Sequence, residues 1–420
     1  YALNKFGYWE NDNIIFKQYL SHDLYDALAV SISSPKIVKR LDSVLKNYKS
    51  KEDIFKTSKE YFTNNDIKLD SKIWFLPFRN KIYDLQNKIW LDHNPEYYIT
   101  KTLSYDWQEP TEEETSLVWK LLKQIQPEAE VRTVLLQLLA TSLDGFNLEK
   151  FVILTGKGRN GKGLINDMLE YALEGFAFKG NAFCLTQPIK PGANPEIAHM
   201  NRKRFVFFRE PPKETPMQNS NLKDITGGGG ICCREAYNNN TDIRLHSSNF
   251  LEANEPPNLA ELPTFADIAR LVIIVYSSTF VEEGELVDES KNIYPKNSFY
   301  KTDEFKEKAK FALLKILMDY YVGHKIMIPE SVKSNTRKFL DKSFKLKDWL
   351  DENIDFNCGH NSYICLSSSF KQIVNSDPYF INCPKTNIIQ NIIDTVIKLY
   401  GEDRYSERKK ISGKDYRHII

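Results

Sequence analysis

Residues 150–163 read KFVILTGKGRNGKG, and this stretch decides the fold. The apolar residues 151–154 predict a buried strand, and the amphipathic residues 164–172 predict a helix that follows it. Between them, residues 156–162 have the spacing G-x-x-x-x-G-K of a phosphate-binding loop. Such a loop requires a strand before it and a helix after it, and both are predicted here.

The loop predicts a site for the phosphates of a nucleotide, with ATP and Mg²⁺ as the expected cofactors. Glycines let the backbone curl so that its N–H groups point at phosphate oxygens, and the helix start adds partial positive charge. Lys162 would supply a cation to the β- and γ-phosphates. The alternative for this stretch is a glycine-rich surface turn. The predicted binding residues are Gly156, Lys157, Gly158, Arg159, Asn160, Gly161, Lys162, Gly163 and Leu164.

The position after Lys162 departs from the usual motif, because Gly163 stands where a Ser or Thr hydroxyl binds Mg²⁺. The metal ion would therefore lose one protein ligand. Mg²⁺ keeps several water ligands in proteins, so we expect a water molecule to fill that place.

A carboxylate at the end of a neighbouring strand is needed to orient the attacking water. The apolar stretch 205–208 is followed by Arg209 and Glu210, and Glu210 is the predicted catalytic acid. Because Arg209 stands where an Asp often precedes this acid, we expect Glu210 to act nearly alone and to hold Mg²⁺ through a water. The alternative is a solvated acid at a strand end.

Two further residues next to apolar stretches complete the candidate catalytic set. Asn254 follows the predicted strand 248–253 and can bond the γ-phosphate or the attacking water. Arg270 precedes the predicted strand 271–276 and is a candidate arginine finger for the nucleotide of a neighbouring subunit. The alternatives are a turn residue before a proline and a surface arginine.

The chain as a whole indicates an α/β protein, because short apolar stretches alternate with helices from about residue 150 onward. Beyond about residue 330 we expect a smaller α/β or helical segment with a basic end. The expected strands are 73–78, 82–85, 89–91, 151–154, 205–208, 248–253 and 271–276, and the expected helices are 34–61, 111–125, 129–143, 164–172 and 303–321.

Composition excludes little. The 420 residues carry a net charge of +1, which by itself favours an ordinary cytosolic enzyme over a nucleic-acid-binding protein.

No apolar run reaches the ~18 residues of a membrane span. The six cysteines lack regular spacing, which favours a reducing compartment. Because residue 1 is Tyr, we expect a piece of a longer chain.

Taken in order, these motifs resemble the superfamily 3 helicases of large eukaryotic DNA viruses, the poxvirus- and asfarvirus-type primase–helicases. Asn160 before Gly161 and Lys162 is similar to that family's G-x-x-x-N-G-K loop. Glu210 stands at the family's acidic strand end and Asn254 at its Asn motif. Arg270 stands where the family has its finger, and the resemblance covers about residues 70–280.

The segment between Glu210 and Asn254 carries a second resemblance. In the family, a Lys, a Gly pair and an Arg precede a β-hairpin that holds DNA in a central channel. The residues that this implies for DNA binding are Lys223, Arg234, Asn238, Asn239, Asn240, Arg244 and His246, with the three asparagines at the hairpin tip. Gly229 and Gly230 depart from the family pattern, since an acid is expected after the Gly pair.

The resemblance implies an AAA+-like core with a parallel sheet at residues 146–325. A mainly helical domain at 1–145 would precede it, and a small winged-helix-like domain at 326–420 would follow. It further implies a hexameric ring on single-stranded DNA, an upstream primase domain and a viral replication site in the host cytoplasm. Two alternatives stay open: a small-molecule P-loop phosphotransferase, and a catalytically weakened ring or loader.

Overall fold

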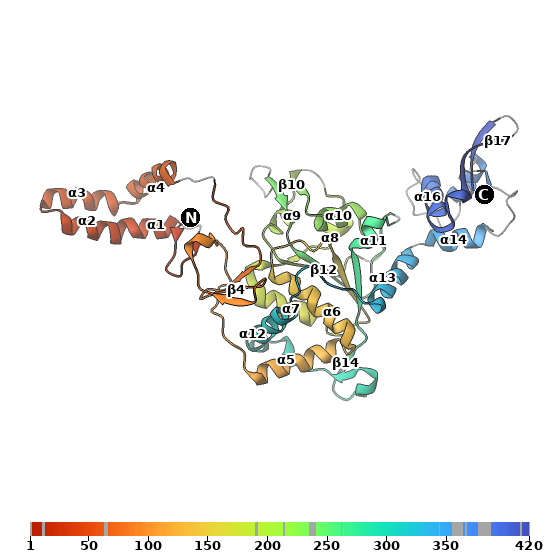
Figure 1. The fold of residues 1–420 in the computed structure, drawn as a ribbon, viewed down its shortest axis with the longest axis horizontal. Coiled ribbons are helices and arrows are strands. Elements are labelled where there is room, and N and C mark those ends of the chain that lie inside the picture. Colours follow the sequence, from red (N-terminus) through yellow and green to blue (C-terminus); the bar gives the residue numbers. More distant parts are fainter. Residues whose placement is uncertain are drawn as a thin grey trace.

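A five-stranded sheet forms the centre of the computed structural model, with the helical N-terminal elements on one side and the C-terminal elements on the other (Figure 1). The structure describes residues 2–10, 13–62, 66–189, 192–212, 215–234, 241–261, 263–343, 345–354, 364–365, 368–376, 388–411 and 414–419. No helix in this described part is long and apolar enough to cross a membrane.

The central sheet confirms the predicted parallel α/β core. Its strands are β6 (Phe151–Thr155), β7 (Ala177–Gly180), β9 (Phe205–Arg209), β12 (Ser248–Ala253) and β13 (Leu271–Val275). They lie in the order β13-β6-β12-β9-β7, and every neighbouring pair is parallel. All five strands therefore place their carboxyl ends at the same edge.

Helices cover both faces of this sheet, and alternate residues of β6 show why. Val152 and Leu154 belong to one buried cluster, whereas Phe151 and Ile153 belong to a second cluster on the opposite face. The first cluster is shared with α5 (Glu112–Ile125), α6 (Ala129–Ala140), α7 (Lys162–Leu173) and α12 (Asp303–Tyr320). The second is shared with α9 (Pro195–His199), α10 (Asn219–Thr226) and α13 (Glu330–Ser343). A strand buried on both faces explains the unbroken apolar run 151–154.

The region before the sheet contains helices and a small antiparallel sheet. The predicted helices over 34–61 are confirmed as α3 (Pro35–Leu45) and α4 (Tyr48–Phe62), preceded by α1 (Asn13–Tyr19) and α2 (Tyr25–Ser31). The predicted strands near 75, 83 and 90 are confirmed as β3 (Phe75–Pro77), β4 (Ile82–Asp84) and β5 (Ile89–Leu91). Thr111 and Glu114 form a capping box at the start of α5, which explains why that helix begins there.

The remaining elements follow β7 in the chain. Short elements between the strands are α8 (Phe183–Thr186), β8 (Gly192–Ala193) and α11 (Phe265–Arg270), and the parallel pair β14 (Thr279–Val281) and β15 (Ile293–Pro295) follows β13. The C-terminal elements are α14 (Lys345–Asn353), α15 (Ser368–Ser376), α16 (Ile388–Tyr400), β16 (Ile364–Cys365), β17 (Tyr405–Ile411) and β18 (Lys414–Ile419). Their own buried cluster, around Trp349 and Ile392, makes this a separate mixed α/β segment. Its assignment as winged-helix-like stays a prediction.

Candidate nucleotide-binding site

The predicted phosphate loop joins the carboxyl end of β6 to the start of α7 at Lys162. Gly156 has φ +146°, and a Cβ built on it would lie 2.5 Å from the carbonyl oxygen of Tyr276. Gly161 has φ +81°, and its Cβ would lie 2.7 Å from Cγ1 of Ile125. Only glycine combines these φ angles with so close an approach. The loop is therefore clamped between the turn after β13 and the end of α5.

Lys162 is buried and lies at the centre of the site, with 7% of its surface exposed. Its Nζ donates to Oδ1 of Asn254 at 2.7 Å and to the carbonyl of Gly156 at 3.3 Å. Burial lowers the pKa of the Lys162 amine, and the charges of Glu210 and Glu252 oppose that shift. Strands β6, β9 and β12 thus bring Lys162, Glu210 and Asn254 to one edge of the sheet.

Glu210 follows β9 and is exposed at this edge. Its backbone N–H donates to the carbonyl of Glu252 at 2.9 Å, and its φ is +40°. The side chain borders a cavity of about 380 Å³ that Arg209, Gly180 and Phe183 also line. The acid therefore has room beside it for a water molecule or a phosphate.

Sequence reasoning missed a second acid, Glu252, which lies on β12 and is only 6% exposed. Its Oε1 accepts a hydrogen bond from Nδ2 of Asn166 at 2.7 Å and from Nε of Arg209 at 3.1 Å. Arg209 also pairs with Asp167 on α7. Burial raises the pKa of the Glu252 carboxyl, while the hydrogen bond from Asn166 and the charge of Arg209 hold it down. The available signal was an acid inside an otherwise buried strand, two positions before Asn254.

Arg209, which stands where we expected an acid, thus belongs to a cluster of opposite charges rather than to an acid pair. The pairing of β12 with β9 sets Glu252 directly opposite Arg209. Glu210 is therefore not the only acid near Lys162, because the charge of Glu252 also acts on the Lys162 amine; the catalytic role of Glu210 stays a prediction. The two acids come from neighbouring strands.

The chemistry of these residues suits an Mg²⁺–nucleotide. Asn160 and Asn166 are buried, and Nδ2 of the first and Oδ1 of the second have no hydrogen-bond partner in the described structure. Carboxylate oxygens are the protein ligands that Mg²⁺ prefers, and a buried lysine beside a curled loop suits phosphate. Among the described residues, no group of three or more His, Cys, Asp or Glu side chains is arranged to hold a metal ion.

Arg270, the predicted finger, lies away from these residues. It ends α11 directly before β13, and Leu271 pairs with Phe151 at the start of β6. The loop begins after Thr155, at the other end of these two strands. Arg270 and the loop are therefore separated by five residues of strand, or about 17 Å. Its Nη1 donates to the carbonyl of Ala266 at 2.9 Å. Arg270 therefore cannot serve the loop of its own chain in this conformation.

The predicted hairpin is confirmed as β10 (Gly230–Arg234) paired antiparallel with β11 (Thr241–Arg244). Arg244 and His246 are exposed at the hairpin's base. The predicted tip residues Asn238, Asn239 and Asn240 lie outside the described residues, as does the side chain of Arg234.

Lys223 lies on α10 and forms an ion pair with the buried Asp267 of α11, with 3.4 Å between Nζ and Oδ1. Asp267 also accepts hydrogen bonds from Thr264, as the second half of a capping box. This predicted DNA contact is thus tied to the helix that ends at Arg270. The ion pair therefore connects a predicted DNA-binding residue, Lys223, to the helix that carries the predicted arginine finger, near the amino ends of the strands.

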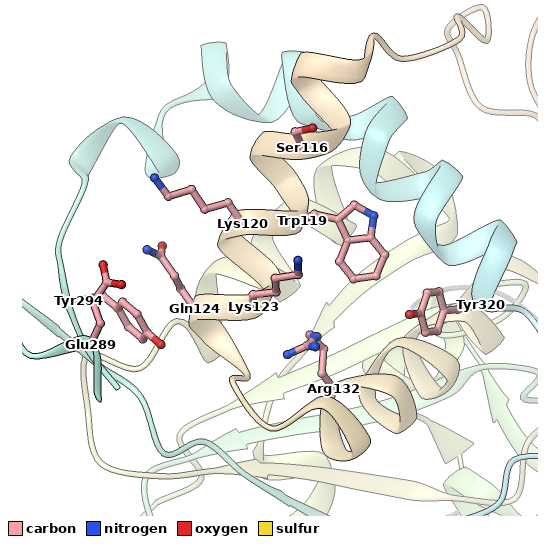
Figure 2. A pocket seen from close by; sticks show the side chains of 9 residues that line it. All are labelled: Ser116, Trp119, Lys120, Lys123, Gln124, Arg132, Glu289, Tyr294 and Tyr320. Atoms are coloured by element: carbon pink, nitrogen blue, oxygen red, sulfur yellow. The ribbon is translucent and has the colours of Figure 1, made fainter. Parts of the chain in front are cut away.

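A basic cavity of about 770 Å³ lies beside α5, and none of the predicted site residues lines it. Figure 2 shows Lys120, Lys123 and Arg132 around this cavity together with the rings of Trp119 and Tyr320. Cations interleaved with aromatic rings are the combination that single-stranded nucleic acids bind. Gln124 also lines this cavity, and its carbonyl accepts a hydrogen bond from Ser278. This bond connects the cavity to the turn after β13, which contacts the phosphate loop.

Comparisons with known proteins find one matching family model and several similar viral proteins. Residues 3–127 match the family model described as D5 N terminal like. The protein "Putative helicase L207/L206" of Acanthamoeba polyphaga mimivirus is 26% identical over 350 residues, which cover 80% of this chain and 36% of that protein. Primase D5 of fowlpox virus is 25% identical over 347 residues, covering 78% of this chain and 43% of that protein. The chain therefore spans less than half the length of these two relatives.

A solved structure of the C-terminal region of NrS-1 in its apo form aligns at 18% identity and a TM-score of 0.40, covering 74% of this chain and 76% of that one. The chain is thus similar to viral proteins named helicase and primase, and its residues 3–127 are similar to the D5 N terminal like family.

Proposed function

We propose that this chain is an ATP-driven DNA helicase motor that moves on single-stranded DNA as a ring during viral DNA replication. The observation that carries the proposal is the convergence of Lys162, Asn254 and Glu210 beside a glycine-clamped loop. Relatives named helicase and primase support it.

Each residue at the carboxyl edge has a definite task in this proposal. The loop N–H groups bind phosphate oxygens, and Lys162 exchanges Asn254 for the β- and γ-phosphates. Asn254 is then free to bond the terminal phosphate or the attacking water. Glu210 orients that water from the end of β9. Bound Mg²⁺ would neutralise charge on the phosphates.

The opposite edge of the sheet supports a motor rather than a small-molecule phosphotransferase. The hairpin β10–β11, Lys223 and Arg270 belong to that edge or to elements beside it, far from the phosphate loop. A phosphotransferase has no use for them, whereas a ring needs one surface for DNA and a second for the neighbouring subunit's nucleotide. The placement of Arg270 fits action in trans, and the ring and an upstream primase domain are part of the proposal.

The proposal is tested by measuring the binding of a fluorescently labelled single strand by anisotropy, at several salt concentrations. Arg244→Ala should weaken binding several-fold and reduce the salt dependence, because backbone contacts release counterions. Lys308→Ala is the matched control, since Lys308 is a surface cation on α12 that pairs with Glu304. DNA binding that is equal in Arg244→Ala and Lys308→Ala would contradict the assigned DNA surface.

The nucleotide half of the proposal is tested separately. Lys162→Ala should abolish binding of a fluorescent ATP analogue, whereas Lys308→Ala should leave it unchanged. ATP binding without any hydrolysis at any Mg²⁺ concentration would favour the weakened ring or loader, for which Gly163 and Arg209 are the relevant departures.

A further inference from the structure

Gly163 and Glu252 share one small space in the site. A Cβ built on Gly163 would lie 3.2 Å from Oε2 of Glu252, a contact tighter than most real Cβ atoms make. The carboxylate therefore lies beside the position from which a Ser or Thr side chain would project. Glycine at this position is explained by the acid next to it, which the sequence motif does not include.

The two oxygens of Glu252 have different surroundings. Oε1 accepts hydrogen bonds from Asn166 and Arg209, which fix the orientation of the carboxylate. Oε2 has no hydrogen bond among the described contacts and points at Gly163. Because hydrogen bonds fix one oxygen of this carboxylate, its second oxygen is oriented and free to bind a metal ion.

We propose that Oε2 of Glu252 is the protein ligand of the nucleotide's Mg²⁺ and replaces the hydroxyl that Gly163 lacks. The inference rests on the proposed function, since it needs a nucleotide in the loop. A carboxylate is a hard oxygen ligand, as Mg²⁺ requires, and its charge exceeds that of a hydroxyl. In this proposal the acid that binds the metal ion is Glu252 on β12. On the neighbouring β9, Arg209 occupies the position at which such motifs often have an Asp.

The role of Arg209 follows from the same arrangement. Its guanidinium lies between Glu252 and Asp167 and contacts both. Asp167 supplies Arg209 with a counter-charge of its own, so Glu252 is not needed merely to neutralise the arginine. Arg209 instead holds the carboxylate in place as a positioning residue.

The direct test measures Mn²⁺ affinity by electron paramagnetic resonance on the full chain with a non-hydrolysable ATP analogue. Glu252→Gln keeps the shape and an oxygen that accepts from Asn166, but removes the charge. Mn²⁺ affinity should fall by at least about tenfold, the loss typical of weakening a metal site. Nucleotide affinity in EDTA should stay unchanged. The control is Glu170→Gln, which removes an acid two turns further along α7.

A rescue experiment uses the shared space. Gly163→Ser alone should weaken nucleotide binding, because the added Cβ meets Glu252. In the Glu252→Ala background the space is free, so Gly163→Ser should regain part of the Mn²⁺ affinity that Glu252→Ala loses.

Three results would overturn the inference. The first is equal Mn²⁺ affinity in Glu252→Gln and Glu170→Gln. The second is recovery of Mn²⁺ affinity when Arg209→Gln is added to Glu252→Gln, because Glu252 would then act only as a counter-ion. The third is a wild-type chain that binds no nucleotide either with metal ion present or in EDTA. That result would refute the proposed function together with the inference.

Discussion

Two glycines of one loop, Gly156 and Gly158, have opposite structural demands, and their alanine variants test the shape of the phosphate loop. Gly156 has φ +146°, and its added Cβ would lie 2.5 Å from a backbone oxygen of Tyr276. Gly158 has no atom within 4 Å of its Cβ position and no positive φ. The same substitution therefore meets strain at one position and open space at the other.

The cost at Gly156 can be worked from these two contributions. A side chain in a backbone region reserved for glycine costs about 1–3 kcal/mol. Relieving a backbone contact by moving the turn costs about another 1–3 kcal/mol. Gly156→Ala should thus destabilise the unliganded core by about 2–6 kcal/mol, whereas Gly158→Ala should stay within about 0.5 kcal/mol of wild type.

Thermal unfolding without nucleotide is the assay. One kcal/mol corresponds to about 2–4 °C for a unit of 150–250 residues, so Gly156→Ala should lower Tm by at least about 4 °C. Equal Tm values for the two variants would refute the loop geometry, including the contact with Tyr276. Since Gly158→Ala should not change stability, any loss of ATP binding in this variant would come from contact with the nucleotide. Such a loss would indicate that Gly158 lies against the phosphates.

Two further predictions concern residues away from the loop. Arg270→Ala should lower the rate of ATP hydrolysis by at least about a thousandfold while ATP affinity changes little, as expected for a finger acting in trans; an equal loss of affinity in a binding titration would sink that role. Burial, with the charges of Lys203 and Arg204, lowers the pKa of Lys101 from its ordinary value of 10.5 to about 8. Between these values the unfolded chain binds more protons than the folded one, so this group makes stability rise with pH from about 8 to about 10.5. Lys101→Met should remove that rise when urea midpoints are compared at pH 7.5 and pH 9.5, and identical pH slopes in the two proteins would contradict it.

The strands of the central sheet could be predicted from the sequence because they are buried on both faces. Such strands appear as short apolar runs bounded by glycine, proline or charged residues, as at 151–154 and 271–275. The polar residues that follow these runs gather at one edge because parallel strands end together. Lys162 and Asn254 could therefore be expected near the same end of the sheet, whereas their hydrogen bond depends on β6 and β12 being neighbours.

Glu252 could not be predicted in this way, because its importance depends on strand register. It lies inside β12, and only the pairing of β12 with β9 and β6 brings it opposite Arg209 and Leu154. Its approach to Gly163 depends in turn on how α7 packs against the sheet. A departure from a motif at one position was visible in the sequence, but the residue that compensates for it lies about 90 positions later in the chain.

The position of Arg270 was open for a different reason. An arginine before a strand can serve its own chain, a neighbouring chain or neither, and the sequence does not distinguish these. The parallel pairing of β13 with β6 places it at the edge opposite the loop. The hairpin was easier to predict, since the sequences of Gly230–Arg234 and Thr241–Arg244 flank a short polar stretch.

ATP hydrolysis measured with and without single-stranded DNA, in wild type and in Lys162→Ala, tests the central claim most directly. The account predicts that DNA stimulates hydrolysis by the wild-type chain and that Lys162→Ala hydrolyses no ATP in either condition. Hydrolysis that is indifferent to DNA would contradict the motor, and hydrolysis that survives Lys162→Ala would contradict the site.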